Sequence, residues 1–383
     1  MPTCATGEIK RIVLLVVIAG AWSVGAQRPA PPARMPLSVG GPAGAAAIGD
    51  LNRDGRNDIA VTAGNAVFVF LGDGRGGFER SARSPFGAGQ NPSDLVLADF
   101  NGDGHLDAAV ANHETDYLSV LIGDGNGALA DPSRVPVPSR PHPHGIAAGD
   151  FNADGHPDVA VESWEEDTVL VVHGNGRGTF AAEPVRLAVG LKPYYKLRAG
   201  ELNADGRDDL VTTNMDGNSV SAVCSGPRGL TQAARTFPIA PSPFAIAIGD
   251  VTGDRIPDLA VAHRWGSLDP KFDGLTVLIG KGACAFAPSS DSPLKVGASP
   301  TAVAIGDVDT DGIGDIATAN MASNDVTVLL ARGSGWRAAP GSPFPVGPRP
   351  SAIALGDLNG DRRADIVVST GSDITILIPP AGW

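Results

Sequence analysis

The chain has 383 residues, with 42 acidic and 29 basic side chains, and its formal net charge at pH 7 is −13. Because there is no basic excess, the composition argues against a nucleic-acid-binding protein. Many of the acidic side chains belong to one repeated loop, so the acidity is explained by that loop and does not require a cationic partner.

Residues 1–26 have the features of a secretory signal peptide. Lys10 and Arg11 precede the apolar run Ile12–Ala21, and small residues follow this run. An apolar run of about ten residues is too short to cross a bilayer. We therefore expect an exported protein that is secreted, periplasmic or at the cell surface, without a membrane span after cleavage. The Pro/Ala/Arg-rich residues 27–36 are expected to form a short linker.

A nine-residue acidic pattern follows, which begins at Asp50 and ends at Asp58 with the sequence Asp-Leu-Asn-Arg-Asp-Gly-Arg-Asn-Asp. The pattern occurs seven times, and successive copies begin 49, 51, 51, 49, 57 and 50 residues apart. The other six copies begin at Asp99, Asp150, Glu201, Asp250, Asp307 and Asp357. This near-constant spacing indicates a repeat architecture.

The residue types in the loop predict calcium sites, up to seven in number and one per repeat. Positions 1, 3, 5 and 9 carry side-chain oxygens, and such hard ligands suit Ca²⁺. Position 7 varies between Arg, His and Ile, which is compatible with a ligand that is a backbone carbonyl. An EF-hand would need Glu at position 12, where the first copy has Val61. The alternative is a set of hairpin turns that are acidic only for solubility.

The predicted calcium ligands occupy positions 1, 3, 5, 7 and 9 of every copy. They are Asp50, Asn52, Asp54, Arg56, Asp58, Asp99, Asn101, Asp103, His105, Asp107, Asp150, Asn152, Asp154, His156, Asp158, Glu201, Asn203, Asp205, Arg207, Asp209, Asp250, Thr252, Asp254, Ile256, Asp258, Asp307, Asp309, Asp311, Ile313, Asp315, Asp357, Asn359, Asp361, Arg363 and Asp365. The fifth site is expected to be the weakest, because Thr252 is at position 3 and Arg255 replaces Gly. The sixth has an extra carboxylate, Asp309, and is expected to be among the tightest.

Each repeat is expected to contain four strands. In the fifth repeat they are Ala245–Gly249 before the loop, Asp258–Ala262 after it, Leu275–Gly280, and a fourth that begins near Phe286. The first strand alternates apolar residues with Gly or Ala, which suits an innermost strand where blades crowd together. Four-stranded units of about 50 residues are typical of propeller blades. The sequence therefore predicts an all-β, seven-bladed β-propeller over residues 37–383, without a second domain.

The N-terminal segment of the propeller is expected to close the ring. The seventh repeat ends after its third strand, Ile374–Ile378, and Pro36–Val39 resembles the missing fourth strand. Val39 lies 11 residues before Asp50, as do equivalent valines before two later loops. We expect Pro36–Val39 to pair beside Ile374–Ile378, because closure removes the exposed edges of an open array.

The repeats resemble FG-GAP/VCBS repeats, as in the N-terminal propeller of integrin α subunits and in many secreted bacterial proteins. The loop Asp99–Asp107, its six relatives and the Val-x-Val-Leu-x-Gly runs after them carry the resemblance, which covers roughly residues 36–383. It implies calcium in the loop between the first and second strands, and ligand contacts mainly on the opposite face. It also implies adhesion or recognition, although some relatives are lectins and some propellers of similar repeats are polysaccharide lyases.

Repeats two to five differ from the others in the segments expected on that opposite face. Their candidate ligand-binding residues are His113, His144, Trp164, Glu165, Tyr194, Tyr195, Lys196, Arg198, His263, Arg264 and Trp265. Aromatic faces beside charged and polar groups suit a carbohydrate or a protein loop. Lys196 and Arg198 replace small residues of an inner strand, and the alternative for them is an ion pair with Glu165 or Glu166 of a neighbouring blade.

The leading hypothesis is an exported, calcium-stabilised, monomeric binding or adhesion module for an extracellular glycan or protein. The second is a polysaccharide lyase or hydrolase, in which His144 or Tyr195 acts as the base beside the two cations, although no catalytic signature such as G-x-S-x-G is present. The third is a structural spacer. Cys224 and Cys284 remain after signal cleavage, and either a disulfide or two buried thiols is compatible with the sequence.

Overall fold

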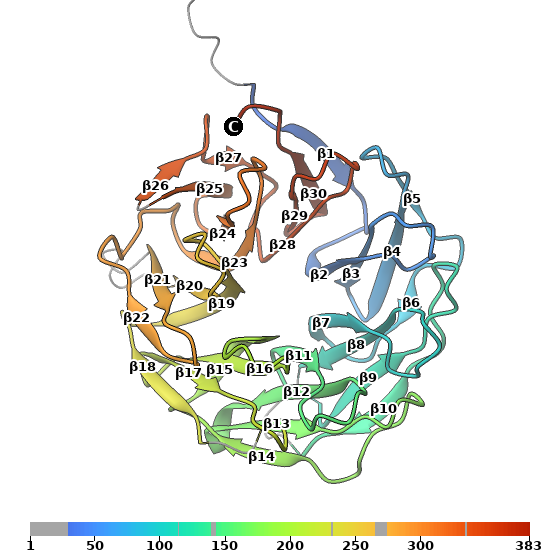
Figure 1. Cartoon of the computed structure of the whole chain (residues 1–383). Coiled ribbons are helices and arrows are strands. Elements are labelled where there is room, and N and C mark those ends of the chain that lie inside the picture. Colours follow the sequence, from blue (N-terminus) through green and yellow to red (C-terminus); the bar gives the residue numbers. More distant parts are fainter. Residues whose placement is uncertain (1–29, 114, 139–142, 231–232, 265–273, 334) are drawn as a thin grey trace, which may run out of the picture.

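The computed structural model describes residues 30–113, 115–138, 143–230, 233–264, 274–333 and 335–383, and of Trp164 only the backbone. The predicted signal peptide and Trp265 lie outside these ranges. The described residues form seven antiparallel sheets arranged as blades around a central axis (Figure 1). The predicted all-β, seven-bladed propeller is therefore confirmed. No helix in these ranges has the length and hydrophobicity that a membrane crossing requires.

The first three blades follow one another along the chain, each with its first strand innermost. Blade one contains β2 (Ala43–Gly49), β3 (Asp58–Ala63), β4 (Ala66–Gly72), β5 (Phe78–Arg80) and the short β6 (Phe86–Gly87). Blade two contains β7 (Pro92–Ala98), β8 (Asp107–Asn112), β9 (Tyr117–Leu121) and β10 (Ser133–Pro136). Blade three contains β11 (Ile146–Gly149), β12 (Asp158–Ser163), the 3-10 turn η1 (Trp164–Glu166), β13 (Thr168–Val172) and β14 (Val185–Ala188).

The remaining blades repeat this order until the ring closes. Blade four contains β15 (Pro193–Gly200), β16 (Asp209–Asn214), β17 (Ser219–Val223) and β18 (Arg235–Pro238). Blade five contains β19 (Pro243–Gly249), β20 (Asp258–His263), β21 (Gly274–Gly280) and β22 (Phe286–Pro288). Blade six contains β23 (Pro300–Gly306), β24 (Asp315–Asn320), β25 (Asp325–Arg332), β26 (Gly335–Ala338) and β27 (Phe344–Pro345). Blade seven contains β28 (Ala352–Gly356), β29 (Asp365–Ser369), β30 (Ile374–Ile378) and β1 (Ala33–Leu37).

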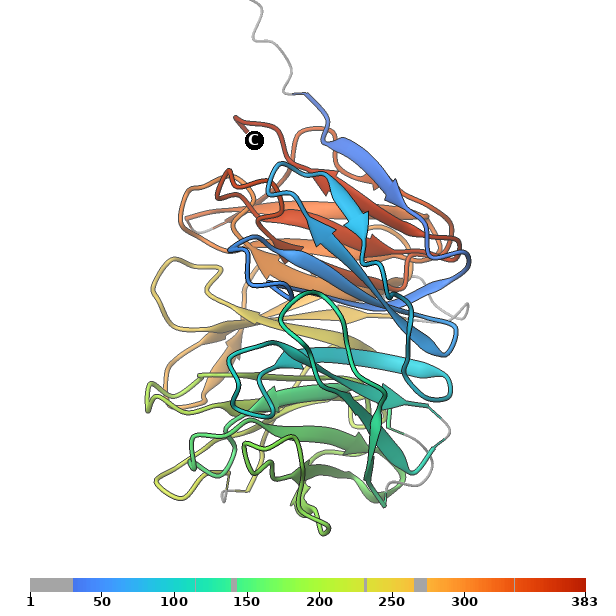
Figure 2. The same ribbon diagram turned by 90° about the vertical axis from the view of Figure 1, so that its right-hand side faces the viewer.

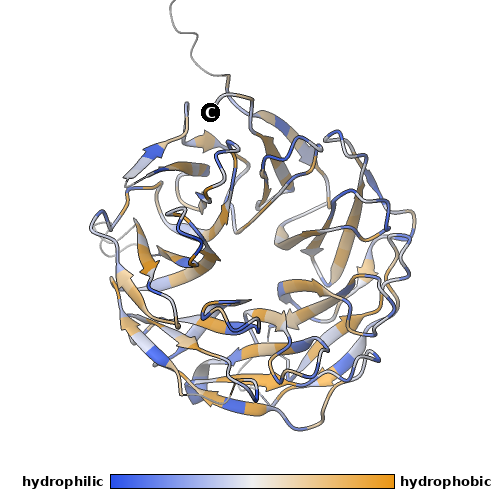
Figure 3. Ribbon diagram, viewed as in Figure 1, coloured by the Kyte–Doolittle hydropathy of each residue, from blue (hydrophilic) through white to orange (hydrophobic). Residues whose placement is uncertain are grey.

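The hydrophobic core is divided into seven clusters, and each cluster lies between two adjacent blades. The second strand of every blade is buried along its whole length. Figure 3 shows hydrophobic residues concentrated in the strands. Stability therefore comes from sheet faces packed blade against blade, because burial of apolar surface is the main favourable term in folding.

The inner strands are crowded where neighbouring blades meet, as their small residues predict. A Cβ added to Gly49 would lie 2.7 Å from Leu106 Cδ1, a side chain of the next blade. A Cβ at Gly249 would lie 2.5 Å from Ile305 Cγ2, again in the next blade. Contacts this short are not tolerated, so glycine at the end of these inner strands lets the branched side chain of the following blade approach.

The ring is closed by β1, which pairs antiparallel with β30 from Ala33 opposite Ile378 to Leu37 opposite Ile374. The predicted partner of β30 is confirmed, but the strand begins three residues before the expected Pro36, within the segment expected to be a linker. The difference has a physical reason, because Met35 and Leu37 alternate with exposed residues and pack against the core between blades seven and one. Figure 1 shows β1 beside β30 at the seam.

The disc has two faces that carry different sets of loops, and Figure 2 shows it from the side. Every acidic loop joins the first strand of a blade to its second and thus lies on one face, as in the link from β2 to β3. Connections between second and third strands, and between blades, lie on the other face.

Cys224 and Cys284 form a disulfide between blades four and five, which decides between the two alternatives that the sequence left open.

Candidate functional site

Each acidic loop folds around its first carboxylate. In the first loop Asp50 accepts the backbone N–H groups of Asp54 at 3.1 Å and Gly55 at 2.9 Å. The Asn52 side-chain oxygen also accepts the N–H of Asp54, at 3.1 Å, and Asp54 accepts that of Arg56 at 2.9 Å. These bonds gather the oxygens of positions 1, 3 and 5 on one side of the chain, because each turn is closed by the side chain that begins it.

The carboxylate at position 9 has a structural role that the sequence did not reveal. Asp58 is fully buried and accepts the N–H of Leu51 at 2.8 Å and that of Gly72 at 2.8 Å. It thereby ties the start of the loop to the end of the third strand. The equivalent pair of hydrogen bonds recurs in blades two to six.

Burial raises the pKa of these carboxyls, and the neighbouring loop carboxylates raise it further. The pKa of Asp107 is raised to about 6, and those of Asp315 and Asp365 to about 7, with desolvation as the largest cause in each case. Carboxyl groups are thus crowded together in and beneath these loops. A bound cation would favour the ionised form, because an opposite charge nearby lowers the pKa of a carboxyl.

The seventh loop contains a buried carboxylate oxygen that lacks a partner. Asp365 accepts the N–H of Leu358 at 2.8 Å through one oxygen, but the other, Oδ1, has no hydrogen bond among the described residues. The reason is that Pro379 follows β30, where the other blades supply a backbone N–H, and proline has none. An orphaned buried oxygen among carboxylates is compatible with a metal ligand.

The donor set of the loops therefore fits a hard cation such as Ca²⁺, because it consists of carboxylate and amide oxygens. The loops differ in how well they fit. Arg255 and Arg362 have φ angles of 66° and 70° where the other five loops have glycine, and a long side chain is strained in that region. That the fifth site binds most weakly remains a prediction, and the strain at Arg255 is a further reason for it.

The sixth loop holds an arginine among its carboxylates. One oxygen each of Asp307, Asp309 and Asp315 lie within 4.8 Å of one another. Arg332, at the end of β25, forms ion pairs with Asp309 and with Asp311, the latter at 2.8 Å. The guanidinium offsets part of the charge that would attract a metal. It remains a prediction that the sixth site is among the tightest. Arg332 would compete with a metal for the carboxylates of this loop.

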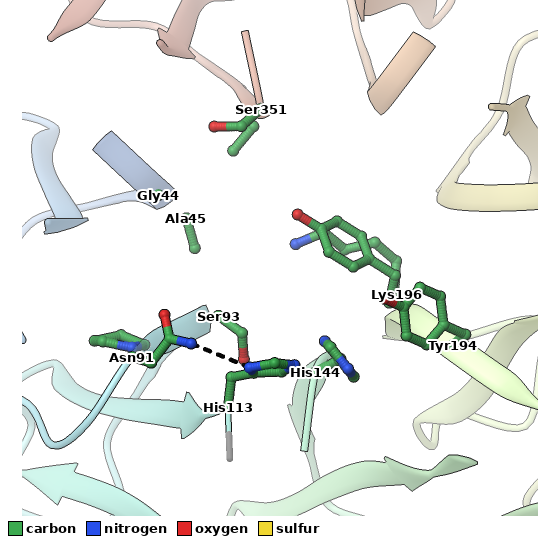
Figure 4. Close-up of a pocket in the computed structure, with 12 residues that line it drawn as sticks. Gly44, Ala45, Asn91, Ser93, His113, His144, Tyr194, Lys196 and Ser351 are labelled. Carbon is green, nitrogen blue, oxygen red and sulfur yellow. Dashed lines mark hydrogen bonds between the residues drawn. The ribbon is translucent and has the colours of Figure 1, made fainter. Parts of the chain in front are cut away.

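On the opposite face, a pocket of about 330 Å³ opens at the mouth of the central channel. Figure 4 shows His113, His144, Tyr194 and Lys196 on one side of it, with small residues of blades one and seven across from them. His113 lies in the connection from β8 to β9, and Asn91 Nδ2 is 3.1 Å from its Nδ1. The pocket, which we call the mouth pocket, is thus lined by blades one to four and seven.

A cluster of rings forms the wall of the mouth pocket on the side of blades three to five. The ring of His144 lies 4.3 Å from that of His113 and 4.5 Å from that of Tyr194. Tyr195 stacks on Phe244 with the ring centroids 4.2 Å apart. Contacts of this kind fix the rings relative to one another. Tyr194 and His113 are half-buried, so these rings are accessible from the mouth pocket.

Tyr195 adopts a backbone conformation that is unusual for a bulky residue. Its φ angle is 79°, and the register of β15 shifts between Pro193 and Leu197, so that this strand bulges. The Glu162 carboxylate of β12 accepts the N–H groups of Tyr195, at 3.1 Å, and of Gly145. A strained residue persists only where its surroundings hold it, and this carboxylate from the neighbouring blade supports the bulge.

Below the mouth pocket, two cations share one carboxylate across the channel. Lys196 Nζ lies 2.9 Å from Asp94 Oδ1, and Arg198 Nη1 lies 3.3 Å from Asp94 Oδ2. Asp94 belongs to β7 of blade two, whereas both cations belong to β15 of blade four. The Lys196 and Asp94 side chains are 6% exposed, but that of Arg198 is 35% exposed. The cluster therefore reaches solvent through Arg198.

Burial dominates the titration of the groups around the channel. It raises the pKa of Tyr195 to about 12 and that of Glu162 to about 8, and it lowers the pKa of Lys196. The Asp94 carboxylate opposes the last effect. Tyr195 is therefore a neutral phenol at physiological pH. Glu162 is mostly protonated there, because its pKa lies above 7.

Comparison with known proteins agrees with this arrangement. A model of the FG-GAP-like repeat matches residues 50–110, 99–161 and 307–368, each of which contains acidic loops and the strands between them. The chain is an FG-GAP repeat propeller. No curated protein sequence matches it.

Solved structures with the same fold have diverse roles. One is a lectin of Agrocybe aegerita, described by its specific recognition of non-reducing terminal N-acetylglucosamine, with 15% identity, a TM-score of 0.54, and coverage of 87% of this chain and 86% of that one. Another is virginiamycin B lyase from Staphylococcus aureus with quinupristin, with 13% identity, a TM-score of 0.57, and coverage of 90% and 99%. A third is a Bacteroides fragilis protein described as a candidate 6-phosphogluconolactonase, with 17% identity, a TM-score of 0.56, and coverage of 84% and 86%. Such likenesses show the fold alone.

The FG-GAP propeller brings together much of the predicted ligand-binding set. His113, His144, Tyr194, Tyr195 and Lys196 line the mouth pocket. Two further members lie close to this group. Arg198 extends the charged cluster below it, and Arg264 lies with its Cζ 4.8 Å from the centre of the Phe244 ring.

Other predicted residues lie elsewhere. Glu165 is exposed in η1, and Glu166 pairs with Arg186 of the outer strand β14. Both acids lie in the connection from β12 to β13, away from the channel. The alternative of an ion pair for Lys196 and Arg198 is therefore found, but with Asp94 as the partner and not Glu165 or Glu166. His263 is fully buried, with Pro241 O and Thr276 Oγ1 2.9 and 2.8 Å from its two nitrogens, and burial lowers its pKa to about 4. It is a neutral core histidine.

The sequence analysis missed Asn91 and Ser93 of the mouth pocket, and also Asp94, Glu162 and Phe244. A signal existed for Asp94 and Glu162. Asp94 is the fifth residue before its loop, as Lys196 is before the fourth loop, whereas the other five repeats have Ala or Gly there. Glu162 is the fourth residue after a position-9 aspartate, where the other repeats have Ala, Thr or Ser. Departures from the repeat consensus mark the charged residues of the channel.

Proposed function

We propose that this FG-GAP propeller is a binding module, that its ligand site is the mouth pocket, and that the ligand is a glycan. The observation that carries the proposal is the half-buried ring of Tyr194 beside Asn91, Ser93 and His113 in one pocket. An aromatic face packs on the apolar face of a sugar ring, while polar groups orient the hydroxyls. A volume of about 330 Å³ suits one sugar residue of a longer chain.

The alternative of a polysaccharide lyase receives less support from the geometry. A lyase needs a base whose pKa lies near the working pH, and Tyr195 does not meet this need, because burial raises its pKa to about 12. His144, which lines the same pocket, is the other candidate base. A pure spacer would not need rings and charges gathered at one mouth. A protein loop remains the other ligand class that this surface suits, and a glycan array distinguishes the two.

The proposal is tested by glycan-array binding of the purified full chain and of the double variant Tyr194→Ala/His113→Ala. We expect the wild type to retain a defined set of glycans and the double variant to lose them while it still folds, which a cooperative melting transition shows. The matched control is Tyr117→Ala, since Tyr117 lies on β9 against Arg134, away from the mouth pocket. Unchanged retention by the double variant, or no retention by the wild type, would overturn the proposal.

We also propose that Ca²⁺ is a structural cofactor of the acidic loops. The oxygens of positions 1, 3 and 5 and the carbonyl of position 7 would hold it, with the buried position-9 carboxylate beneath. The donor chemistry and the orphaned oxygen of Asp365 support this proposal. Export to a calcium-rich compartment is part of the same proposal, since extracellular calcium modules work with weak sites.

A further inference from the structure

The charges at the channel do not balance. Lys196 and Arg198 contribute two positive charges, and the Asp94 carboxylate that they share contributes one negative charge. The other acid described near them is Glu162, whose carboxyl is fully buried and has an oxygen, Oε2, without a hydrogen-bond partner among the described residues. Burial disfavours the charged form of this carboxyl, as it does that of Lys196. Among the described residues, Asp94 is thus the one acid that pairs with the two basic side chains.

The other blades do not supply the missing negative charge from their inner strands. At the position equivalent to Asp94 and Lys196, the remaining repeats have Ala45, Gly145, Ala245, Ala302 and Ala352. At the position equivalent to Arg198 they have Ala47, Val96, Ala147, Ala247, Ala304 and Ala354. The described lining of the channel at this level is therefore apolar apart from the three charged groups. Two basic side chains that share one acid are a local exception in a chain whose net charge is −13.

Of the two basic side chains, Lys196 borders the mouth pocket, and Arg198 lies in the channel directly below it. Lys196 lines both the mouth pocket and the channel below it. The Arg198 side chain is 35% exposed, and both of its described hydrogen bonds, to Asp94 and to the carbonyl of Leu197, use Nη1. The Nη2 edge of the guanidinium is thus left to bind a further acceptor. Paired guanidinium N–H groups match the geometry of a carboxylate.

We propose that the glycan recognised at the mouth pocket is anionic, and that the carboxylate of an acidic sugar binds at Arg198 and Lys196 while its ring packs beside Tyr194. The inference rests on the proposed glycan-binding function and specifies its ligand class. The carboxylate completes the charge balance that Asp94 leaves open. Asn91, Ser93 and His113 face the hydroxyls of the same sugar.

The test uses two probes that differ in charge and by one methyl group per carboxyl, an oligogalacturonate and its methyl ester, with binding to the full chain measured by calorimetry. We expect the acid to bind at least tenfold more tightly than the ester, because only the acid accepts charge-assisted hydrogen bonds at a carboxylate. Arg198→Gln should weaken binding of the acid at least tenfold and leave the ester unchanged. The control is Arg134→Gln on the outer strand β10, which should bind both probes as the wild type does.

The outcomes separate this inference from the proposed function. Equal affinity for acid and ester would overturn the anionic assignment and leave glycan binding intact. Unchanged acid binding by Arg198→Gln would show that the carboxylate does not bind there, and would also overturn the assignment. If an array of acidic and neutral glycans gives no binding at all, the proposed function fails and the inference fails with it. Melting temperatures of both variants show whether the fold is preserved.

Discussion

Glu162 connects the stability of the fold with the shape of the mouth pocket. Its carboxyl group accepts the N–H groups of Tyr195 and Gly145 through one oxygen, while the second oxygen has no hydrogen-bond partner among the described residues. The group therefore holds a strained residue of blade four from a strand of blade three. Because the surroundings bury it completely, its protonation state is coupled to folding.

The melting temperature is expected to fall as the pH rises from about 5 to 8. The unfolded chain ionises Glu162 near its ordinary pKa of 4.5, whereas the folded protein keeps the proton up to about 8. The stabilisation is complete below the unfolded pKa and is lost through this window, since a proton bound only by the folded state favours folding at low pH. Asp94 and Lys196 face this group from blades two and four.

The variant Glu162→Gln isolates this contribution, because its amide oxygen still accepts the two N–H groups. Melting curves of both proteins in the same buffer and the same excess of CaCl₂ should show a shallower fall with pH for the variant than for the wild type. Glu165→Gln, an exposed neighbour, is the control. Parallel slopes for the wild type and Glu162→Gln would mean that the buried carboxyl does not titrate in this range.

The predicted residues that lie at the channel are those that break a repeat. Lys196 and Arg198 stand where most other repeats have small residues, which is why the sequence drew attention to them. Their partner was not predictable, because Asp94 lies in a blade that is not adjacent to theirs. Repeat spacing gives the position of a residue along a blade, but it does not show which side chains meet across the axis.

At the scale of elements, the acidic loop contains two kinds of carboxylate, whereas the sequence pattern treats all of them as metal ligands. Position 9 carries a structural carboxylate that joins the loop to the third strand, as Asp58 does through Leu51 and Gly72. Positions 1, 3 and 5 present the more exposed oxygens. The strands around the loop were predictable because their alternation is regular. One hydrogen-bond partner of the position-9 carboxylate lies at the end of the third strand, 14 to 22 residues away. That partner could not be predicted from the loop pattern.

Calcium is expected to stabilise the protein more at pH 8 than at pH 5. Without metal, Asp107, Asp315 and Asp365 keep their protons up to pH 6 or 7, and the stability that this provides is lost as the pH rises above their ordinary value of 3.8. Calcium binds the ionised carboxylates, so its contribution grows over the same range.

The measurement is the melting temperature of metal-free protein with and without excess CaCl₂ at both pH values, with MgCl₂ as the control cation. The gap between the two curves should widen with pH, because a ligand bound only by the folded state stabilises it by RT ln(1 + [L]/Kd) per site. An identical melting temperature with and without calcium at pH 8 would contradict calcium stabilisation.

Arg332 makes the sixth loop a separate case. Its guanidinium pairs with Asp309 and Asp311, so a metal would have to displace it or share these carboxylates. Arg332→Gln is expected to lower the melting temperature of the metal-free protein and to increase the shift that calcium produces. Arg337→Gln, on β26 of the same blade, is the matched control. A calcium shift that is the same in Arg332→Gln and in Arg337→Gln would show that the arginine does not compete.

At the scale of the whole molecule, seven similar blades gain stability only as a closed ring. Each core cluster lies between two blades, so an open array would leave two sheet faces uncovered. The ring is joined by β1, which alone brings the N-terminal segment to β30. Blade number and closure were predictable from repeat spacing. The starting residue of β1 was not, because it depends on the burial of Met35.

Loss of the closing strand should therefore destabilise the propeller as a whole. Met35→Asp places a charge in the core between blades seven and one, where Met35 packs, and burial of an unpaired charge costs several kcal/mol. Arg34→Asp, exposed on the other side of the same strand, is the control for the added charge. We expect the first variant to melt at a lower temperature and to aggregate in light scattering, since an unpaired β30 offers its edge to other chains. If both variants melt together with the wild type, β1 is dispensable, and the blades are held by their faces alone.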